Sequence, residues 1–146
     1  MKTIRIARLR PNAILPSRKH PQDAGLDLYA AEAGHLPPHS SAIVPTGITV
    51  EILPGYVGLI KPKGRNDHLL GAGVVDAGYQ GEILVKVVNP YATPLDIRPG
   101  DAIGQLLILP IETPQVQEAT VDEIHHQASS RGATGGIVEQ TQPPHA

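Results

Sequence analysis

Residues 41–61 read SAIVPTGITVEILPGYVGLIK, and this stretch indicates the fold class. Its apolar residues fall in short runs of strand length, separated by Pro45-Thr46-Gly47 and by Pro54-Gly55. Isoleucine and valine favour strands, whereas proline and glycine favour turns. We therefore predict two short strands within 41–52, a turn at Pro54-Gly55 and a third strand over 56–61.

The same alternation of apolar runs and turns continues on both sides of this stretch. We expect three further strands and two further turns, namely strands over 3–9, 83–88 and 103–109 and turns near Ala77-Gly78 and at Pro99-Gly100. Helical periodicity is weak, and only 121–127 has the pattern of a single helical turn. Many short strands joined by turns predict one all-β domain, a sandwich or a barrel, whose sheet edges favour association with other copies.

The composition limits the classes of function. The chain has 146 residues, a formal net charge of -2, four tyrosines and neither tryptophan nor phenylalanine. The core must therefore come from Ile, Val, Leu and Ala, and we expect no nucleic-acid partner, because neither a basic surface nor stacking platforms are present. The absence of cysteine excludes disulfides and thiolate metal sites and fits a reducing, cytoplasmic location. We expect no membrane span and no secretory signal, since the required apolar runs are missing.

Asp23-Ala24-Gly25-Leu26-Asp27-Leu28-Tyr29 places two carboxylates around a glycine. Asp27 lies between two leucines, and a carboxylate in an apolar stretch needs a partner. The simpler interpretation is a turn aspartate or a structural ion pair. The alternative is an oxygen ligand for Mg²⁺, either direct or through water.

Residues 71–82 form the richest segment for function. Its glycines allow a ligand to approach the backbone closely, and backbone N–H and C=O groups can read the edge of a base. Asp76 follows Val74-Val75, so we expect it at the end of a buried strand, where partial burial would favour general-base action on a water molecule. Tyr79 offers a flat face beside it. An ordinary hairpin turn is the simpler interpretation.

Three further segments have polar residues that could contact phosphate. Residues 61–68 are basic and loop-like. Gln105 interrupts the apolar run 103–109, so its amide needs a partner if it is buried. Residues 129–136 offer small residues, backbone N–H groups and one arginine, although a flexible tail is the simpler interpretation.

Taken in order, these segments resemble the motifs of the dUTPase family. The resemblance is carried by Asp23–Ala31, by Val44–Ile48 with Pro54–Gly58, by Gly73–Glu82 and by Gly100–Leu106. It spans roughly residues 3–135 and implies a jelly-roll-like, distorted β-barrel that assembles as a homotrimer with shared active sites. It also implies a β domain over 1–127 and a mobile C-terminal tail over 128–146 that closes over the site.

The resemblance further implies hydrolysis of dUTP to dUMP and pyrophosphate with Mg²⁺, which limits uracil in DNA and supplies dUMP for thymidylate synthesis. Asp76 would activate the water that attacks the α-phosphorus, Tyr79 would pack against the deoxyribose, and Asp27 would hold the hydrated Mg²⁺. Uracil would be bound by the backbone of Gly71, Ala72, Gly73, Val74 and Val75. The phosphates would be contacted by Lys63, Gly64, Gln105, Arg131 and Gly132.

Two motifs depart from the family pattern. The second motif normally reads Pro-Arg-Ser-Gly, whereas this chain reads Pro62-Lys63-Gly64-Arg65, has no serine there and is about four residues short before Gly71. The fifth motif lacks the phenylalanine that would cover the uracil. The sequence therefore leaves open a dUTPase-fold protein that binds nucleotide or a protein partner with weak or lost turnover. A related dCTP-deaminating enzyme is a third alternative.

Overall fold

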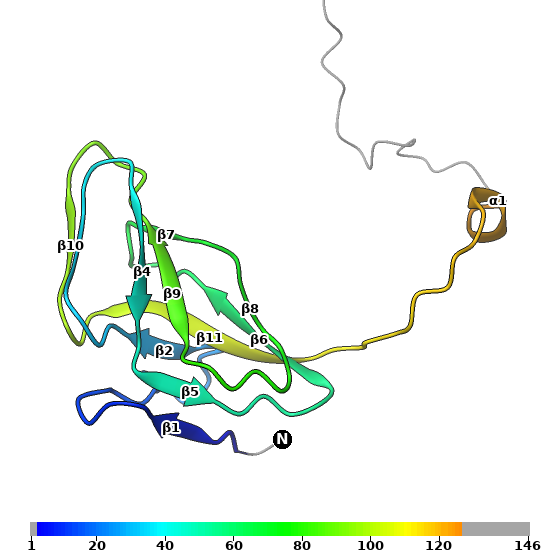
Figure 1. Ribbon diagram of the computed structural model, residues 1–146, viewed down its shortest axis with the longest axis horizontal. Coiled ribbons are helices and arrows are strands. Elements are labelled where there is room, and N and C mark those ends of the chain that lie inside the picture. The colour runs from blue at the N-terminus through cyan, green and yellow to red at the C-terminus, as the bar shows by residue number, and fades with distance from the viewer. Residues whose placement is uncertain (1–2, 127–146) are drawn as a thin grey trace, which may run out of the picture. The chain divides into compact units, whose positions relative to one another are not determined.

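The computed structural model describes residues 3–126, and nearly all of its regular structure is β (Figure 1). Internal contacts divide the chain into two units, Met1–Thr113 and Pro114–Ala146. The strands of the described residues all belong to the first unit, and helix α1 (Val121–Ile124) belongs to the second. None of the helices in this part of the chain is long and apolar enough to cross a membrane.

The strands are short and separated by turns. In chain order they are β1 (Ile6–Arg8), β2 (Leu26–Tyr29), β3 (Gly34–Leu36), β4 (Ser41–Pro45), β5 (Ile48–Val50), β6 (Tyr56–Lys61), β7 (Leu69–Leu70), β8 (Gly73–Val75), β9 (Leu84–Val88), β10 (Leu95–Ile97) and β11 (Ala102–Pro110).

The strands form two sheets and two smaller ribbons (Figure 1). One sheet has the strand order β2-β11-β6-β8, and the other has the order β4-β9-β7. The ribbons are β1-β5 and β10-β3, and every pairing is antiparallel. The protein therefore has the all-β, jelly-roll-like architecture that the sequence predicted.

Alternate strand positions supply one aliphatic core. In β9, Val85 and Val87 are buried whereas Leu84 and Lys86 are exposed, as expected for a strand with one face on the core. Fully buried side chains of the core include Leu28, Leu36, Ile48, Ile83, Ile103 and Leu106. No aromatic residue is among the buried residues of this cluster, which agrees with the composition.

Strand β11 is the longest strand, and an irregularity in it matters for the site. It pairs with β2 on one side and with β6 on the other. The pairing with β6 runs from Tyr56 opposite Pro110 to Lys61 opposite Gln105 and stops there. The register against β2 shifts between Ala102 and Gly104, which marks a β-bulge. The loop that follows β6, residues 62–68, therefore begins beside the bulged end of β11.

Most of the predicted elements are confirmed. The strand over 56–61 has the predicted bounds, two strands flank Pro45-Thr46-Gly47, and the turns at Pro54-Gly55, Ala77-Gly78 and Pro99-Gly100 are present. The strand predicted over 3–9 is shorter, at Ile6–Arg8. Strands β2, β3, β7 and β10 were not predicted, because each has at most four residues and a polar or weakly periodic sequence.

Candidate functional site

A polar cavity of about 490 Å³ lies where β2 meets loop 62–68. Its lining residues are Lys19, His20, Asp23, Asp27, Lys63, Gly64, Arg65, Asn66 and Ala102. We call this space the polar cavity. It combines two carboxylates with three permanent cations, so it can receive an anion of high charge together with a divalent cation.

The centre of this arrangement is an ion pair between Asp27 and Lys63. In β2, the leucines on either side of Asp27 are buried in the core, and the alternation of the strand turns the carboxylate to the opposite face. Lys63 Nζ lies 2.5 Å from Asp27 Oδ1, and the two side chains are only 21% and 16% exposed. Lys63 is thus the partner that a half-buried carboxylate requires.

Gln105 ties the same segments together from β11. In the sheet it lies opposite Asp27 on one side and Lys61 on the other. Its side-chain amide donates to the carbonyl oxygen of Pro62 at 2.9 Å, which supplies the partner expected from the sequence. The side chain also packs so closely on Gly25 that a Cβ there would collide with it. The structure therefore brings Asp27, Lys63 and Gln105 together.

The donor set around Asp27 fits Mg²⁺. Asp23 and Asp27 both line the polar cavity, and Asp23 Oδ2 accepts the backbone N–H of His20 at 3.0 Å. Within residues 3–126 no group of three or more His, Cys, Asp or Glu side chains forms a metal cage. Mg²⁺ commonly binds through one or two carboxylates and completes its shell with water and substrate phosphates, so two carboxylates suffice.

A second space, the hairpin cavity, has a volume of about 260 Å³. It is lined by Ile60, Ala72, Gly73, Val74, Val75, Tyr79, Glu82, Ile83 and Leu84. Strand β8 is the edge of its sheet, so one side of its backbone has no strand partner within this chain. Gly73 is required here, because a Cβ would lie 2.7 Å from Ile60 Cβ.

Asp76 and Tyr79 lie on the turn that follows β8. Tyr79 N donates to Asp76 O at 3.2 Å, and Gly78 has φ +86°, a conformation that favours glycine. The sequence predicted partial burial of Asp76, and this prediction is wrong for the single chain, where Asp76 is exposed. The physical reason is that β8 is an edge strand, and Asp76 begins the turn that follows this strand.

A network of polar contacts fixes this hairpin to other segments. The hydroxyl of Tyr79 donates to the carbonyl oxygen of Glu82 at 2.8 Å. The carboxylate of Glu82 accepts from Arg10 Nη2 at 3.2 Å, and Arg10 Nη1 also binds Glu32 Oε1 at 2.5 Å. Next to Glu82, the carbonyl of Ile83 accepts the hydroxyl of buried Thr46 at 2.6 Å. Glu82 and Ile83 thus join this hairpin to the segments that contain Arg10 and Thr46.

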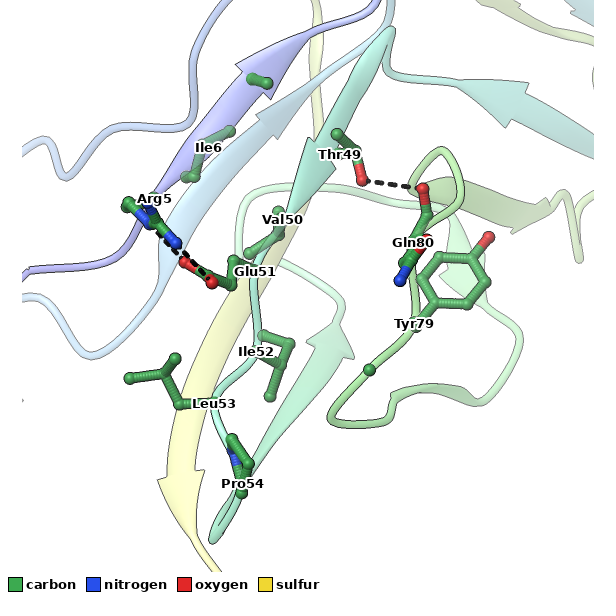
Figure 2. A pocket seen from close by; sticks show the side chains of 12 residues that line it. Arg5, Ile6, Thr49, Val50, Glu51, Ile52, Leu53, Pro54, Tyr79 and Gln80 are labelled. Atoms are coloured by element: carbon green, nitrogen blue, oxygen red, sulfur yellow. Dashed lines mark hydrogen bonds and ion pairs between the residues drawn. The ribbon is translucent and has the colours of Figure 1, made fainter.

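A third space, of about 550 Å³, was not anticipated from the sequence (Figure 2). It is an apolar groove with Ile6, Val50 and Ile52 along it and the turn with Tyr79 and Gln80 on its other side (Figure 2). At its rim Arg5 and Glu51 form two hydrogen bonds of 2.5 and 2.6 Å. These bonds lower the pKa of the Glu51 carboxyl and raise that of the Arg5 guanidinium. The two residues are 46 positions apart, so no local pattern marks the pair.

The predicted site residues therefore fall into separate places. Asp27, Lys63 and Gly64 line the polar cavity, and Ala72 to Val75 with Tyr79 line the hairpin cavity. These two cavities share no lining residue, and Asp76 lines neither. Gly71 also lines neither cavity, and its N–H donates to Lys86 O at 2.9 Å. Arg131 and Gly132 lie outside the described residues.

Comparison with known proteins places this geometry in a family. The family model named dUTPase matches residues 11–135. The chain belongs to the dUTPase family. The predicted family and the predicted class of enzyme, a nucleotide hydrolase, are thereby confirmed.

Curated dUTPases cover nearly the whole chain. The deoxyuridine 5'-triphosphate nucleotidohydrolase of Mycolicibacterium vanbaalenii is 44% identical over 141 residues, which cover 91% of this chain and 92% of that protein. The protein of the same name from Mycobacterium tuberculosis is 40% identical over the same shares of the two chains.

Solved dUTPase structures share the fold. The dUTPase of Staphylococcus bacteriophage 80alpha with dUpNHpp matches with a TM-score of 0.81 and 28% identity, over 92% of this chain and 96% of that chain. A mutant dUTPase from phage phi11 of S. aureus, described with a structural Mg(II) ion, matches with a TM-score of 0.76 and 28% identity, over 81% and 97% of the two chains.

Proposed function

We propose that this dUTPase-family chain hydrolyses dUTP to dUMP and pyrophosphate with Mg²⁺ as cofactor, and so limits uracil in DNA and supplies dUMP for thymidylate synthesis. The observation that carries the proposal is the meeting of two sequence motifs at the Asp27–Lys63 ion pair, inside a cavity large enough for a polyphosphate. The curated relatives are named for this reaction, and a structural neighbour was solved with dUpNHpp.

The charges of the polar cavity support binding of a triphosphate. Lys19, Lys63 and Arg65 supply three positive charges, and Asp23 and Asp27 supply two negative charges. The protein alone would leave most of the charge of a triphosphate unbalanced. Mg²⁺, held by Asp27 directly or through water, would neutralise part of that charge and polarise the phosphoryl oxygens. Lys63, the backbone of Gly64 and the amide of Gln105 would orient the phosphate chain.

The hairpin would bind the nucleoside and supply the general base. The free side of β8 offers backbone donors and acceptors over Gly73–Val75, which suits the polar edge of uracil, and the backbone of Gly71 and Ala72 would complete this contact. Tyr79 would pack against the deoxyribose and leave no room for a 2′-hydroxyl. Asp76 would accept a proton from the water that attacks the α-phosphorus.

The separation of these parts supports a homotrimer with shared sites. Asp76 is exposed and lines neither cavity in the single chain, so a second copy would supply the general base to the polar cavity. The sheet β4-β9-β7 also exposes large apolar side chains, with Ile43 64%, Leu69 53% and Leu84 47% exposed. Such side chains suit burial against another copy.

The segment 128–146 would close over the bound nucleotide, with Arg131 and Gly132 at the terminal phosphates. A glycine-rich segment with an arginine suits this role because backbone N–H groups and a guanidinium both bind phosphate. The absence of cysteine supports a cytoplasmic location.

One observation favours a second candidate, a nucleotide-binding protein of this fold with weak turnover. Loop 62–68 has no serine, and the space around Gly64 is open, with no heavy atom within 4 Å of where a Cβ would stand. The deciding experiment is pyrophosphate release from dUTP with Mg²⁺, run beside dTTP, dCTP and UTP. Release from dUTP alone supports the hydrolase. Binding of dUTP without release supports the second candidate, and release of ammonia from dCTP supports the deaminase.

A further inference from the structure

Loop 62–68 has no serine, yet side chains anchor it firmly to β11. Asn66 Nδ2 donates to the carbonyl oxygen of Ala102 at 3.1 Å. His68 Nε2 lies 2.8 Å from the carbonyl oxygen of Ile103, in a buried contact. A carbonyl oxygen can only accept, so Nε2 of His68 carries the proton.

The position of these two bonds follows from the bulge in β11. Strand β6 stops pairing at Lys61 opposite Gln105, so the segment from Ala102 to Gly104 lies past the end of that ladder. Buried backbone carbonyls need donors, and here side chains of the loop supply them where the strand has ended. Asn66 and His68 thereby attach loop 62–68 to β11 beyond the point where β6 stops pairing with it.

The burial of His68 and the packing of Leu70 show that loop 62–68 is tightly attached to β11. His68 is only 6% exposed, although histidine is a polar residue and lies in a loop. Leu70, just after it, packs on Gly104, where a Cβ would come within 2.9 Å of Leu70 Cδ1. The loop is thus packed against the bulged end of β11 over its last residues.

The attachment determines where the phosphate-contacting turn lies. Asn66 N donates to Lys63 O at 3.1 Å, so residues 63–66 form a turn with Asn66 at its end. At the start of the turn, Lys63 bonds to Asp27. Between them, the N–H groups of Gly64 and Arg65 donate to no backbone carbonyl among residues 3–126, and both residues line the polar cavity. Adjacent backbone N–H groups of this kind suit an anion.

We propose that Asn66 and His68 are positioning residues of the phosphate site. By holding the end of the turn on the carbonyls of Ala102 and Ile103, they keep Lys63 and the N–H groups of Gly64 and Arg65 directed at the phosphates. This inference rests on the proposed function of the polar cavity.

The test compares Asn66→Ala, His68→Ala and His68→Gln with Asn89→Ala in the full-length protein. Asn89 is the matched control, because it is 2% exposed and its amide donates to three backbone carbonyls of other segments, but it does not line the polar cavity. Three quantities are measured for each variant, namely Tm, the Kd for inorganic pyrophosphate with Mg²⁺ and the KM and kcat for dUTP. Amide hydrogen exchange of residues 62–68 is followed in parallel.

Asn66→Ala and His68→Ala are expected to speed exchange in the loop and to raise KM and the pyrophosphate Kd on the order of tenfold, with a smaller change in kcat. His68→Gln should recover much of the affinity, since its amide can donate to the same carbonyl. Asn89→Ala should lower Tm and leave KM and the pyrophosphate Kd unchanged. If His68→Ala does not fold, Asn66→Ala, whose side chain is less buried, decides the question by the same measurements.

The inference is overturned if both alanine variants behave like Asn89→Ala, with lower Tm and normal affinity for pyrophosphate. Unchanged exchange in residues 62–68 would overturn it as well. Wild-type protein that binds pyrophosphate but does not hydrolyse dUTP would contradict the proposed function alone, because binding and exchange test the positioning role without turnover.

Discussion

Lys63 Nζ lies 2.5 Å from Asp27 Oδ1, so a cation of loop 62–68 neutralises a carboxylate of β2 at the wall of the polar cavity. The sequence left open whether Asp27 serves an ion pair or a metal. The structure shows the ion pair, and it is compatible with the proposed metal role, because a carboxylate has two oxygens and Lys63 engages one of them.

Removal of this cation should affect both stability and substrate binding. Lys63→Met leaves the Asp27 side chain, only 16% exposed, without a positive partner. We expect the free energy of unfolding to fall by about 1–3 kcal/mol and KM for dUTP to rise by about tenfold. Chemical denaturation and steady-state kinetics measure the two effects. Lys61→Met, which removes an exposed lysine of β6, is the control and should change neither quantity much.

Asp76→Asn should abolish hydrolysis and spare folding and dUTP binding. The amide keeps the shape of the side chain but cannot take a proton from water, and loss of a general base commonly costs about 10²–10⁴-fold in rate. Single-turnover hydrolysis and dUTP titration measure the two properties. Asp122→Asn in α1 is an exposed control. A kcat near the wild-type value in Asp76→Asn would remove Asp76 as the base.

Deletion of residues 128–146 should raise KM or lower kcat and leave the oligomer unchanged. The reason is that Arg131 and Gly132 are proposed to contact phosphates, whereas the strands described for residues 3–126 lie outside this segment. Kinetics and light scattering on the truncated chain test both parts. Unaltered activity would show that this segment is no lid.

The full-length protein should have the mass of a trimer in solution. Ile43→Glu replaces an exposed apolar side chain of sheet β4-β9-β7 by a carboxylate and should weaken that trimer, with activity lost in proportion. Analytical ultracentrifugation at several concentrations measures the association. A monomeric wild-type protein that retains full activity would refute the shared-site proposal.

Gly73→Ala should destabilise the hairpin. Its Cβ would lie 2.7 Å from Ile60 Cβ, so β8 must move away from β6, at a cost of about 1–3 kcal/mol. Thermal unfolding measures the loss. Gly64→Ala is the matched control for stability, since nothing lies within 4 Å of its Cβ position, and its Tm should stay near the wild-type value.

The sequence predicted the strands and turns that are marked by residues close together in the chain. Strand β6 was predicted with its bounds because Pro54-Gly55 and Pro62 delimit a continuous apolar run. Strands β3 and β10 were missed because each has three residues and contains a charged or titratable side chain, and their stability comes from pairing with each other. That pairing joins His35 to Asp96, which are 61 positions apart, and leaves no local pattern.

The same limit applies to the site. The sequence identified Asp27, Lys63 and Gln105 through resemblance to family motifs, and the structure brings them together. It did not identify Asn66 or His68, because their role depends on a bulge in β11 that only the pairing with β2 and β6 creates. It placed Asp76 in a partly buried position because the burial of a strand end depends on which strand forms the sheet edge.

Tyr79 is held at its hydroxyl by the carbonyl of Glu82, while the Glu82 carboxylate is bonded to Arg10. The ring is therefore restrained before any nucleotide arrives, and little conformational entropy remains to be lost there on binding. Discrimination between deoxyribose and ribose would then come from a preorganised surface. Conformational changes during the catalytic cycle would then occur in segments outside this hairpin.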